Sequence, residues 1–230
     1  MFLLDSQGFS IPMAFVDLIP VILFFISGII LLNDLYNKLV KGNYALLATG
    51  VSMIFLAGLL KAIHKILAGA GVCDFTALNK SFFPMQSFGF VFLGAALLGL
   101  FYTKRHHEEK TLVVVPFLFI PILTELVEYN SSMPFVIIQV LGATVFYFMI
   151  FYIGLKMKSI SSMILTILAF VTMLCMGYLS SKFSDGDLAK LNWIAEVVNI
   201  VSQGALLGSV FILHKKGLNN FIFKKRGDIE

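Results

Sequence analysis

Three polar residues stand on one face of an apolar stretch near the end of the chain. Glu196, Asn199 and Gln203 are spaced i, i+3 and i+7, so a helix would align them in one stripe. Residues 192–213 around them are otherwise long and apolar enough to cross a bilayer. A carboxylate in hydrocarbon is costly unless it faces the interior of a helix bundle or meets a partner. The stripe therefore predicts a functional site inside the membrane.

Other predicted spans bring ionisable and amide side chains to a similar depth. Lys61 and His64 lie one helical turn apart near the outer end of the second span, while Gln86 and Glu125 stand in the third and fourth. Most of these groups lie roughly 5–12 Å from the outer membrane boundary, at about 1.5 Å of rise per residue. We expect them to converge on a polar cavity that opens outward. The candidate substrate-binding residues are Lys61, His64, Gln86, Glu125, Glu196 and Asn199.

Depth in the membrane separates an interior role from contact with lipid headgroups. Side chains within about two turns of a span end can extend to the headgroups. Lys61, Glu125 and Glu196 lie deeper, where insertion costs several kcal/mol, so an interior position is favoured. Even there, an ion pair could serve structure alone, because desolvation cancels much of its attraction. Headgroup contact is expected for Asp17, Lys65 and Glu128.

The inner half of the bundle is expected to carry little charge. Its polar residues within the spans are hydroxyls such as Ser27, Ser52 and Ser209, with Gln203 near mid-depth. Charged groups within the spans therefore gather toward the outer side. No charged path leads from the predicted cavity to the cytoplasm.

The composition is that of a protein that crosses a membrane many times. Of the 230 residues, 59% are hydrophobic and 13% are charged, which is about half the charge of a soluble domain. Apolar runs near the spanning length recur along the chain, and the connections are too short to hold a soluble domain. We predict an all-α, polytopic bundle of seven transmembrane helices that forms one domain over residues 1–230. The predicted spans are 13–32, 44–67, 83–103, 111–128, 133–155, 160–180 and 192–213.

Basic residues predict the orientation of this bundle. One set of loops, together with the C-terminal tail, holds 12 of the 17 lysines and arginines. The positive-inside rule then places the N-terminus outside and the C-terminus in the cytoplasm, in the cytoplasmic (plasma) membrane. The net charge of +4 comes from residues that flank spans, so it does not indicate a nucleic-acid partner. Membrane lipid and a small-molecule ligand are the expected partners.

A weak internal repeat relates the two ends of the chain. The pattern D-x-x-x-L-N occurs at residues 74–79 and again at 187–192, each time just before a span. Seven residues after each asparagine comes an amide, Gln86 in one span and Asn199 in the other. Parallel repeats of this kind occur in transporters, and the resulting 3+1+3 layout resembles that of sugar-exporting SWEETs and seven-helix opsins, without a family signature. The possible half-repeats are 13–103 and 133–213, with 111–128 as the linker helix.

Glycines in the third and seventh spans are spaced for close helix packing. Gly94 and Gly99 lie in one leucine-containing run, and Gly204 and Gly208 lie in the other. Small residues at such spacing let two helix backbones approach each other. Packing therefore explains these glycines without a ligand.

Signatures of metal, nucleotide and cofactor chemistry are absent from the sequence. Spans that bind metal usually carry H-x-x-x-H or E-x-x-H, and neither occurs. There is no phosphate-binding glycine loop, no G-x-S-x-G turn, no C-x-x-C pair and no lysine for retinal in residues 197–213. We therefore expect no cofactor and no bound metal. The histidines and glutamates of residues 106–109 are expected in a solvated cytoplasmic turn.

Three functions remain open from the sequence. The first is a carrier of a small polar or charged solute, with proton coupling through Glu125 or Glu196 as an option because a desolvated carboxylate binds a proton more readily. The second is an intramembrane enzyme acting on lipid or a lipid-linked substrate at the outer leaflet, with carboxylates and His64 as general acid and base. The third is a seven-helix receptor or sensor that acts through a partner subunit. Short loops, buried charges of both signs and the lack of a catalytic signature favour the carrier.

Overall fold

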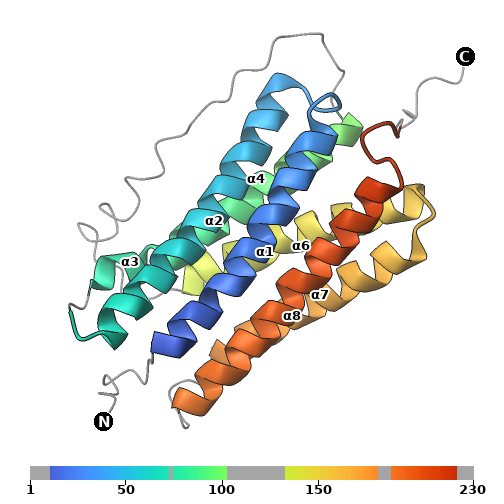
Figure 1. Ribbon diagram of the computed structural model, residues 1–230. Coiled ribbons are helices and arrows are strands. Elements are labelled where there is room, and N and C mark those ends of the chain that lie inside the picture. Colours follow the sequence, from blue (N-terminus) through green and yellow to red (C-terminus); the bar gives the residue numbers. More distant parts are fainter. Residues whose placement is uncertain (1–10, 73–74, 103–132, 181–187, 222–230) are drawn as a thin grey trace, which may run out of the picture.

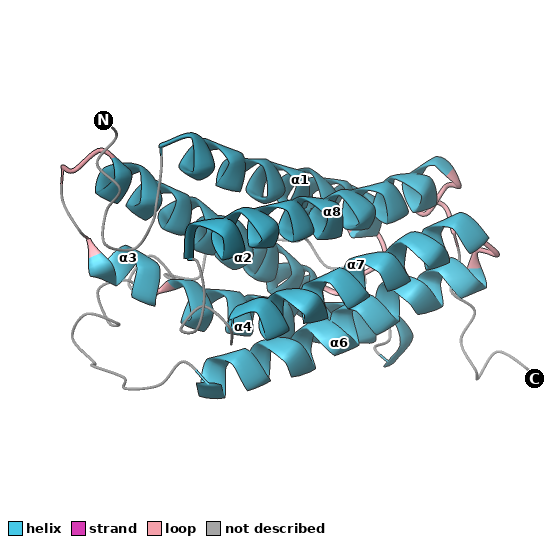
Figure 2. Cartoon of the chain, turned by 90° about the horizontal axis from the view of Figure 1, so that it is seen from below, coloured by secondary structure: helices cyan, strands magenta, loops and turns pink. Residues whose placement is uncertain are grey.

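The described part of this chain is a bundle of long helices. The computed structural model describes residues 11–72, 75–102, 133–180 and 188–221, and within them all regular structure is helical. The long helices lie side by side, with one short helix at an end of the bundle (Figures 1 and 2). The long helices are α1 (Ile11–Leu35), α2 (Lys41–Gly69), α4 (Phe82–Tyr102), α6 (Met133–Lys156), α7 (Ile160–Ser180) and α8 (Leu188–Lys215), and the short one is α3 (Thr76–Lys80).

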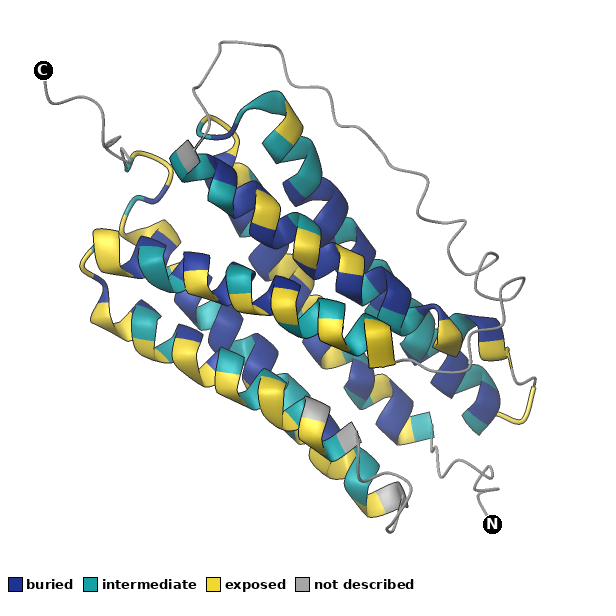
Figure 3. Ribbon diagram, turned by 180° about the vertical axis from the view of Figure 1, so that it is seen from behind, coloured by how far each residue is buried: buried dark blue, intermediate teal, exposed yellow. Residues whose placement is uncertain are grey.

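The length and surface of these helices are those of a membrane protein. Five helical stretches are long and apolar enough to cross a bilayer: α1, α2, α4 together with α3, α6 and α8. In α7 the corresponding apolar stretch is shorter, Ile160–Met176. Exposed positions follow the outer faces of the helices (Figure 3). Large apolar residues are among them, and Phe15, Ile137 and Ile164 are each more than half exposed. Soluble proteins rarely expose apolar surface on this scale.

The predicted spans can be compared with six of the helices. Each of those six spans coincides with a helix to within four residues at either end. The first helix continues past the predicted end at residue 32, and it takes in Asp34, which is buried. The fourth predicted span, 111–128, lies outside the described residues together with Glu125 and Glu128. A count of seven spans therefore stays a prediction.

The helices pack in the order of the chain and close into a ring. The principal contacts of the long helices join α1 to α2, α2 to α4, α4 to α6, α6 to α7 and α7 to α8, and α8 returns to α1. Phe101, near the end of α4, stacks edge-on against Tyr152, near the end of α6, with 5.1 Å between ring centroids. Since these are the C-terminal ends of both helices, α4 and α6 run in the same direction.

Two helix crossings depend on glycine. Where α2 meets α4, a Cβ atom on Gly50 would lie 2.8 Å from the carbonyl oxygen of Gly89. Where α4 meets α6, a Cβ atom on Gly142 would lie 2.6 Å from the backbone nitrogen of Val91. Helix backbones this close leave no room for a side chain. The crossings therefore fix how near α4 can lie to its two neighbours.

The glycines singled out in the sequence have different surroundings. A Cβ on Gly94 would meet Gly142 and Val145 of α6 at 3.1–3.2 Å, so close packing is confirmed there. For Gly204 the prediction was wrong, because the nearest atom, in Leu23, would be 4.0 Å away. Leu165 Cδ1 would lie 3.0 Å from a Cβ on Gly208, and Gly99 faces the side chain of Asn43 rather than a helix backbone.

Three helices end in the same backbone turn, the Schellman motif. Its left-handed residue is Gly71 after α2 (φ 67°), Lys158 after α6 (φ 51°) and Gly217 after α8 (φ 81°). In each case the N–H of the next residue donates to the carbonyl five positions earlier, at 2.9–3.1 Å. Lys158 is the exception among the three because its side chain makes the left-handed conformation costly.

Candidate functional site

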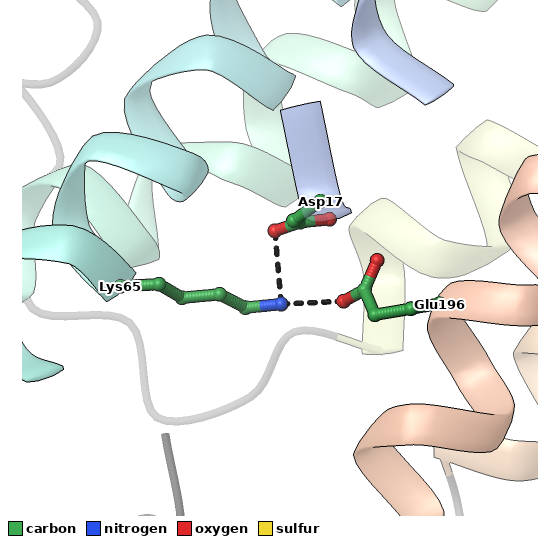
Figure 4. Close-up of polar contacts among 3 residues, drawn as sticks. All are labelled: Asp17, Lys65 and Glu196. Atoms are coloured by element: carbon green, nitrogen blue, oxygen red, sulfur yellow. Dashed lines mark hydrogen bonds and ion pairs between the residues drawn. The ribbon is translucent and has the colours of Figure 1, made fainter. Parts of the chain in front are cut away.

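A buried ion triad joins three helices at one end of the ring. The ammonium of Lys65, in α2, lies 2.9 Å from Asp17 Oδ2 in α1 and 2.6 Å from Glu196 Oε1 in α8 (Figure 4). All three residues are at most 5% exposed. A buried lysine is tolerated when carboxylates surround it at hydrogen-bonding distance. The triad therefore ties α1, α2 and α8 together by charge.

The triad corrects one prediction. Asp17 and Lys65 were expected to reach the lipid headgroups, and both instead point into the bundle. Depth along a span cannot distinguish these outcomes, because a residue near a span end can face either lipid or a neighbouring helix. Here both lie on inward faces and meet Glu196, which was expected inside.

Lys61 completes the charge balance of this region. It precedes Lys65 by one turn of α2 and is half-buried, with Nζ 4.2 Å from the centroid of the Phe82 ring. Its charge also interacts with the carboxylates of Asp17 and Glu196. Within the described helices, no acceptor receives a hydrogen bond from its ammonium. The two lysines and two carboxylates together carry no net charge.

A small cavity lies next to these charges, between α1, α2, α4 and α8. Its volume is about 40 Å³. On this measure a water molecule needs roughly 10–15 Å³, so the cavity has room for about three waters. Pro20 and Phe82 belong to its mostly apolar remainder. Its polar lining consists of Asp17, Lys61, Gln86, Asn199 and Gln203.

Two amide oxygens in the cavity wall have no hydrogen-bond donor. They are Gln86 Oε1 in α4 and Gln203 Oε1 in α8, and both atoms are buried among the described residues without a partner. A buried acceptor without a partner costs about 1–3 kcal/mol. These two oxygens have almost no accessible surface, so they are a cost to the observed packing of α4 and α8.

The structure brings together some of the predicted site residues and leaves others apart. Lys61, Gln86 and Asn199 line the cavity, and Glu196 lies in the adjacent triad. His64 is buried in α2 and is not part of the lining. Glu125 lies outside the described residues.

Sequence reasoning missed Asp17 as a wall residue of the cavity. The signal was present, since Pro20 follows it by one turn in α1 and both now line the same space. Asp17 was expected to contact the lipid headgroups. It marks instead the place where α1 faces the cavity.

A second polar contact lies at the opposite end of the ring. His214 Nδ1 is 2.8 Å and 3.1 Å from the two carboxylate oxygens of Asp34, which is 3% exposed. The expectation that this half carries only hydroxyls and one amide was therefore wrong. Asp34 follows Asn33 and looked like a loop residue, whereas α1 continues through it.

Hydroxyl groups form a separate contact between α7 and α8. Ser209 lies 2.8 Å from the Ser162 hydroxyl and 2.7 Å from the Thr166 hydroxyl, and Ser202 donates to the carbonyl of Ala169. All of these hydroxyl residues are buried. Their bonds are satisfied within the pair of helices, so this cluster holds the bundle rather than a ligand.

Comparisons with known proteins give no external guide to function. No protein-family model, curated protein or solved structure matches this chain. Within the described ranges, no group of three histidine, cysteine or acidic side chains is placed to hold a metal ion. The geometry of the cavity and of the contacts around it is what bears on function.

Proposed function

We propose that this protein is a carrier of a small polar solute and that the cavity beside Lys61 is its binding site. One observation supports this above the others. Polar side chains from four helices face a shared space inside a bundle whose outer surface is apolar. Polar groups inside a membrane are costly and usually mark a substrate or ion pathway.

The direction of the helices supports a seven-span arrangement. α4 and α6 run the same way, so the chain has to cross from one end of the bundle to the other between Tyr102 and Met133. An apolar span over 111–128 would make that crossing. With seven spans, the positive-inside rule gives an outer N-terminus and a cytoplasmic C-terminus in the plasma membrane.

The ring also supports the internal repeat. If α1, α2 and α4 are matched in order with α6, α7 and α8, every principal contact of the ring has an equivalent. The α1–α2 contact corresponds to α6–α7, α2–α4 corresponds to α7–α8, and α4–α6 corresponds to α8–α1. Gln86 and Asn199, which the repeat makes equivalent, both line the cavity. The first helices of the two halves have a proline in second position and a polar residue five places on, Asp17 in α1 and Gln139 in α6. A binding site between related halves is usual in carriers.

Two polar contacts suit the alternating access that a carrier needs. The triad of Asp17, Lys65 and Glu196 closes one end of the α1–α8 contact, and the pair of Asp34 and His214 closes the other. The cavity opens to one side when one contact breaks and to the other side when the second breaks. Each contact is replaced by water when it opens, which keeps the difference in free energy between the two states small.

Uptake into proteoliposomes tests the proposal. We expect at least one solute in a library of labelled polar and charged metabolites to enter faster than it enters protein-free vesicles. Glu196→Gln should abolish any response to a pH gradient if this carboxylate couples transport to protons. A flat result for every compound, with and without the gradient, would contradict a carrier function.

A matched pair of variants ties uptake to the cavity. Asn199→Leu removes a lining amide, whereas Gln139→Leu removes an amide of α6 whose oxygen is buried but which does not line the cavity. We expect uptake to be lost in the first variant and retained in the second. Equal loss in both would mean that the cavity is not the binding site.

A further inference from the structure

Four exposed lysines gather at the end of the bundle that is opposite the triad. Two belong to the end of α6 and the turn that follows it, and two to the end of α8: Lys156, Lys158, Lys215 and Lys216. The Lys216 ammonium donates to the carbonyl oxygen of Lys158 at 3.1 Å, so the two segments lie side by side (Figure 1). The fold therefore builds one basic surface, the lysine patch, from parts of the chain that are 58 positions apart.

No exposed carboxylate compensates the lysine patch within the described residues. Every acidic side chain there is buried, Asp17 and Glu196 in the triad and Asp34 against His214. Four neighbouring ammonium groups repel one another and attract an anion. The lysine patch is therefore a surface on which negative charge is favoured.

Two of the four lysines lie where helix geometry alone does not require them. Lys156 and Lys215 stand in the last turn of a helix, where a cation offsets the helix dipole. Lys216 follows the end of α8, and Lys158 has a φ of 51°. The corresponding left-handed positions after α2 and α8 are glycines, so a lysine at 158 gives up backbone stability and gains an ammonium group.

Apolar and aromatic surface adjoins the lysine patch. Lys156 Nζ lies 5.3 Å from the centroid of the Tyr152 ring, and Lys215 Nζ lies 4.6 Å from that of Phe211. Phe211 is 43% exposed, and Ile160, the first residue of α7, is 71% exposed. A ligand that covers both kinds of surface has an anionic headgroup and apolar chains, which describes a phospholipid better than a soluble anion.

We propose that the lysine patch binds the headgroup of an anionic phospholipid whose acyl chains lie against the apolar surface beside it. The phosphate accepts hydrogen bonds from ammonium groups of both segments, and it thereby joins the turn after α6 to the end of α8. In the orientation proposed above, this end faces the cytoplasm, where the leaflet carries anionic lipid. The site is separate from the cavity and does not depend on transport.

Lipid binding to the purified protein tests the proposal. Phosphatidylglycerol with a fluorescent acyl chain is titrated into the detergent-solubilised protein, and phosphatidylcholine with the same label is the neutral comparison. One lysine near an anionic surface raises the binding constant about fivefold. We expect phosphatidylglycerol to bind at least roughly 25-fold more tightly, the effect of two lysines, and this preference should shrink as salt is added.

Two charge-matched double variants locate the site. Lys158→Gln with Lys216→Gln removes one charge from each segment of the lysine patch, so the affinity for phosphatidylglycerol should fall roughly 25-fold. Lys80→Gln with Lys190→Gln removes two exposed lysines at the opposite end of the bundle. The affinity should then stay within about twofold of the unmodified protein, because charges more than a Debye length away are screened.

A further variant separates lipid binding from stability. Lys158→Gly removes one ammonium group and also relieves the left-handed backbone. We expect the affinity for phosphatidylglycerol to fall about fivefold while the unfolding temperature in lipid-free detergent rises. Opposite changes of this kind cannot result from misfolding.

Each contrary result overturns the proposal. Equal affinities for phosphatidylglycerol and phosphatidylcholine would mean that the headgroup charge is not recognised. Equal losses in the two double variants would mean that lipid responds to the total charge of the protein and not to the lysine patch. Glycerol 1-phosphate that binds as tightly as phosphatidylglycerol would replace the lipid with a soluble anion.

Discussion

At the scale of single residues, the ammonium of Lys65 bridges carboxylates from two helices that are far apart in sequence. Neither Asp17 nor Glu196 has water to replace that ammonium, because both are at most 5% exposed. Breaking a buried pair by removing one partner is far more harmful than replacing the whole set with neutral groups. The triad is therefore expected to stabilise the bundle only as a complete unit.

The Lys65→Met variant tests this dependence. It leaves two carboxylates buried without their cation, and we expect the free energy of unfolding to fall by about 3–5 kcal/mol. The quadruple variant Asp17→Asn, Lys61→Met, Lys65→Met, Glu196→Gln, which also removes the neighbouring charge of Lys61, should recover most of the loss. Thermal unfolding of the detergent-solubilised proteins provides the measurement. Equal unfolding temperatures for the single and the quadruple variant would contradict this dependence.

Lys158 offers a stabilising substitution. Its φ of 51° lies in the left-handed region, where a Cβ atom costs roughly 1–2 kcal/mol. Lys158→Gly should therefore raise the free energy of unfolding by about 1 kcal/mol, which corresponds to roughly 2–4 °C in a chain of this size. Lys158→Ala removes the same charge but keeps Cβ, so it should give no gain. A rise in both variants would point to charge rather than backbone conformation.

At the scale of helices, contacts between neighbours are made by different kinds of residue. α4 meets α2 and α6 through glycine backbones, and α7 meets α8 through hydroxyls. α1 meets α8 through the Lys65 triad at one end and the contact of Asp34 with His214 at the other. Apolar side chains offer no hydrophobic gain when helices leave lipid for one another. Close backbone packing and polar contacts are what hold this ring together.

The α4–α6 crossing can be tested with a single methyl group. In Gly142→Ala the new Cβ would lie 2.6 Å from the backbone of α4, so the helices have to move apart. We expect a loss of about 1–3 kcal/mol in the free energy of unfolding. Gly204→Ala is the control, since its nearest neighbour would lie 4.0 Å away. Unfolding temperatures that fall equally in both variants would exclude the crossing as the cause.

The hydroxyl contact between α7 and α8 has a similar test. Ser209→Ala leaves the hydroxyls of Ser162 and Thr166 without this partner in a dry interface, and about 1 kcal/mol should be lost. Thr144→Val serves as control, because that hydroxyl is exposed and donates to its own helix. The unfolding temperatures of the two variants are compared in the same detergent, without denaturant. No difference between the two variants would mean that the cluster adds nothing to stability.

At the scale of the whole molecule, the helices were predictable and their contacts were not. A membrane span can be recognised by the length of its apolar stretch. Six helices were therefore placed to within four residues at either end from hydropathy alone. The face that each residue presents depends on the rotation of its helix, which hydropathy does not report when both lipid and interior are apolar. Asp17 and Lys65 were misplaced for that reason.

Contacts between distant parts of the chain could also not be predicted from the sequence. Asp34 and His214 are separated by 180 positions, and nothing local to either of them signals the other. The glycines at the α2–α4 crossing lie in different helices and show no shared pattern in sequence. By contrast, Lys61, Gln86 and Asn199 were grouped by depth, and they line one cavity because residues at one depth in a ring of helices have few other places to meet.

Two contacts of the closed ring, α4 with α6 and α1 with α8, are made by different kinds of interaction. α4 and α6 touch backbone to backbone through Gly142, whereas α1 and α8 are joined at one end by the buried triad and at the other by the contact of Asp34 with His214. The α4–α6 contact is suited to act as a hinge, and the α1–α8 contact is suited to open. A clamshell motion of this kind would uncover the cavity while the glycine crossing of α4 and α6 stayed packed. Locking α1 to α8 should then stop the proposed transport, while locking α4 to α6 should leave it intact.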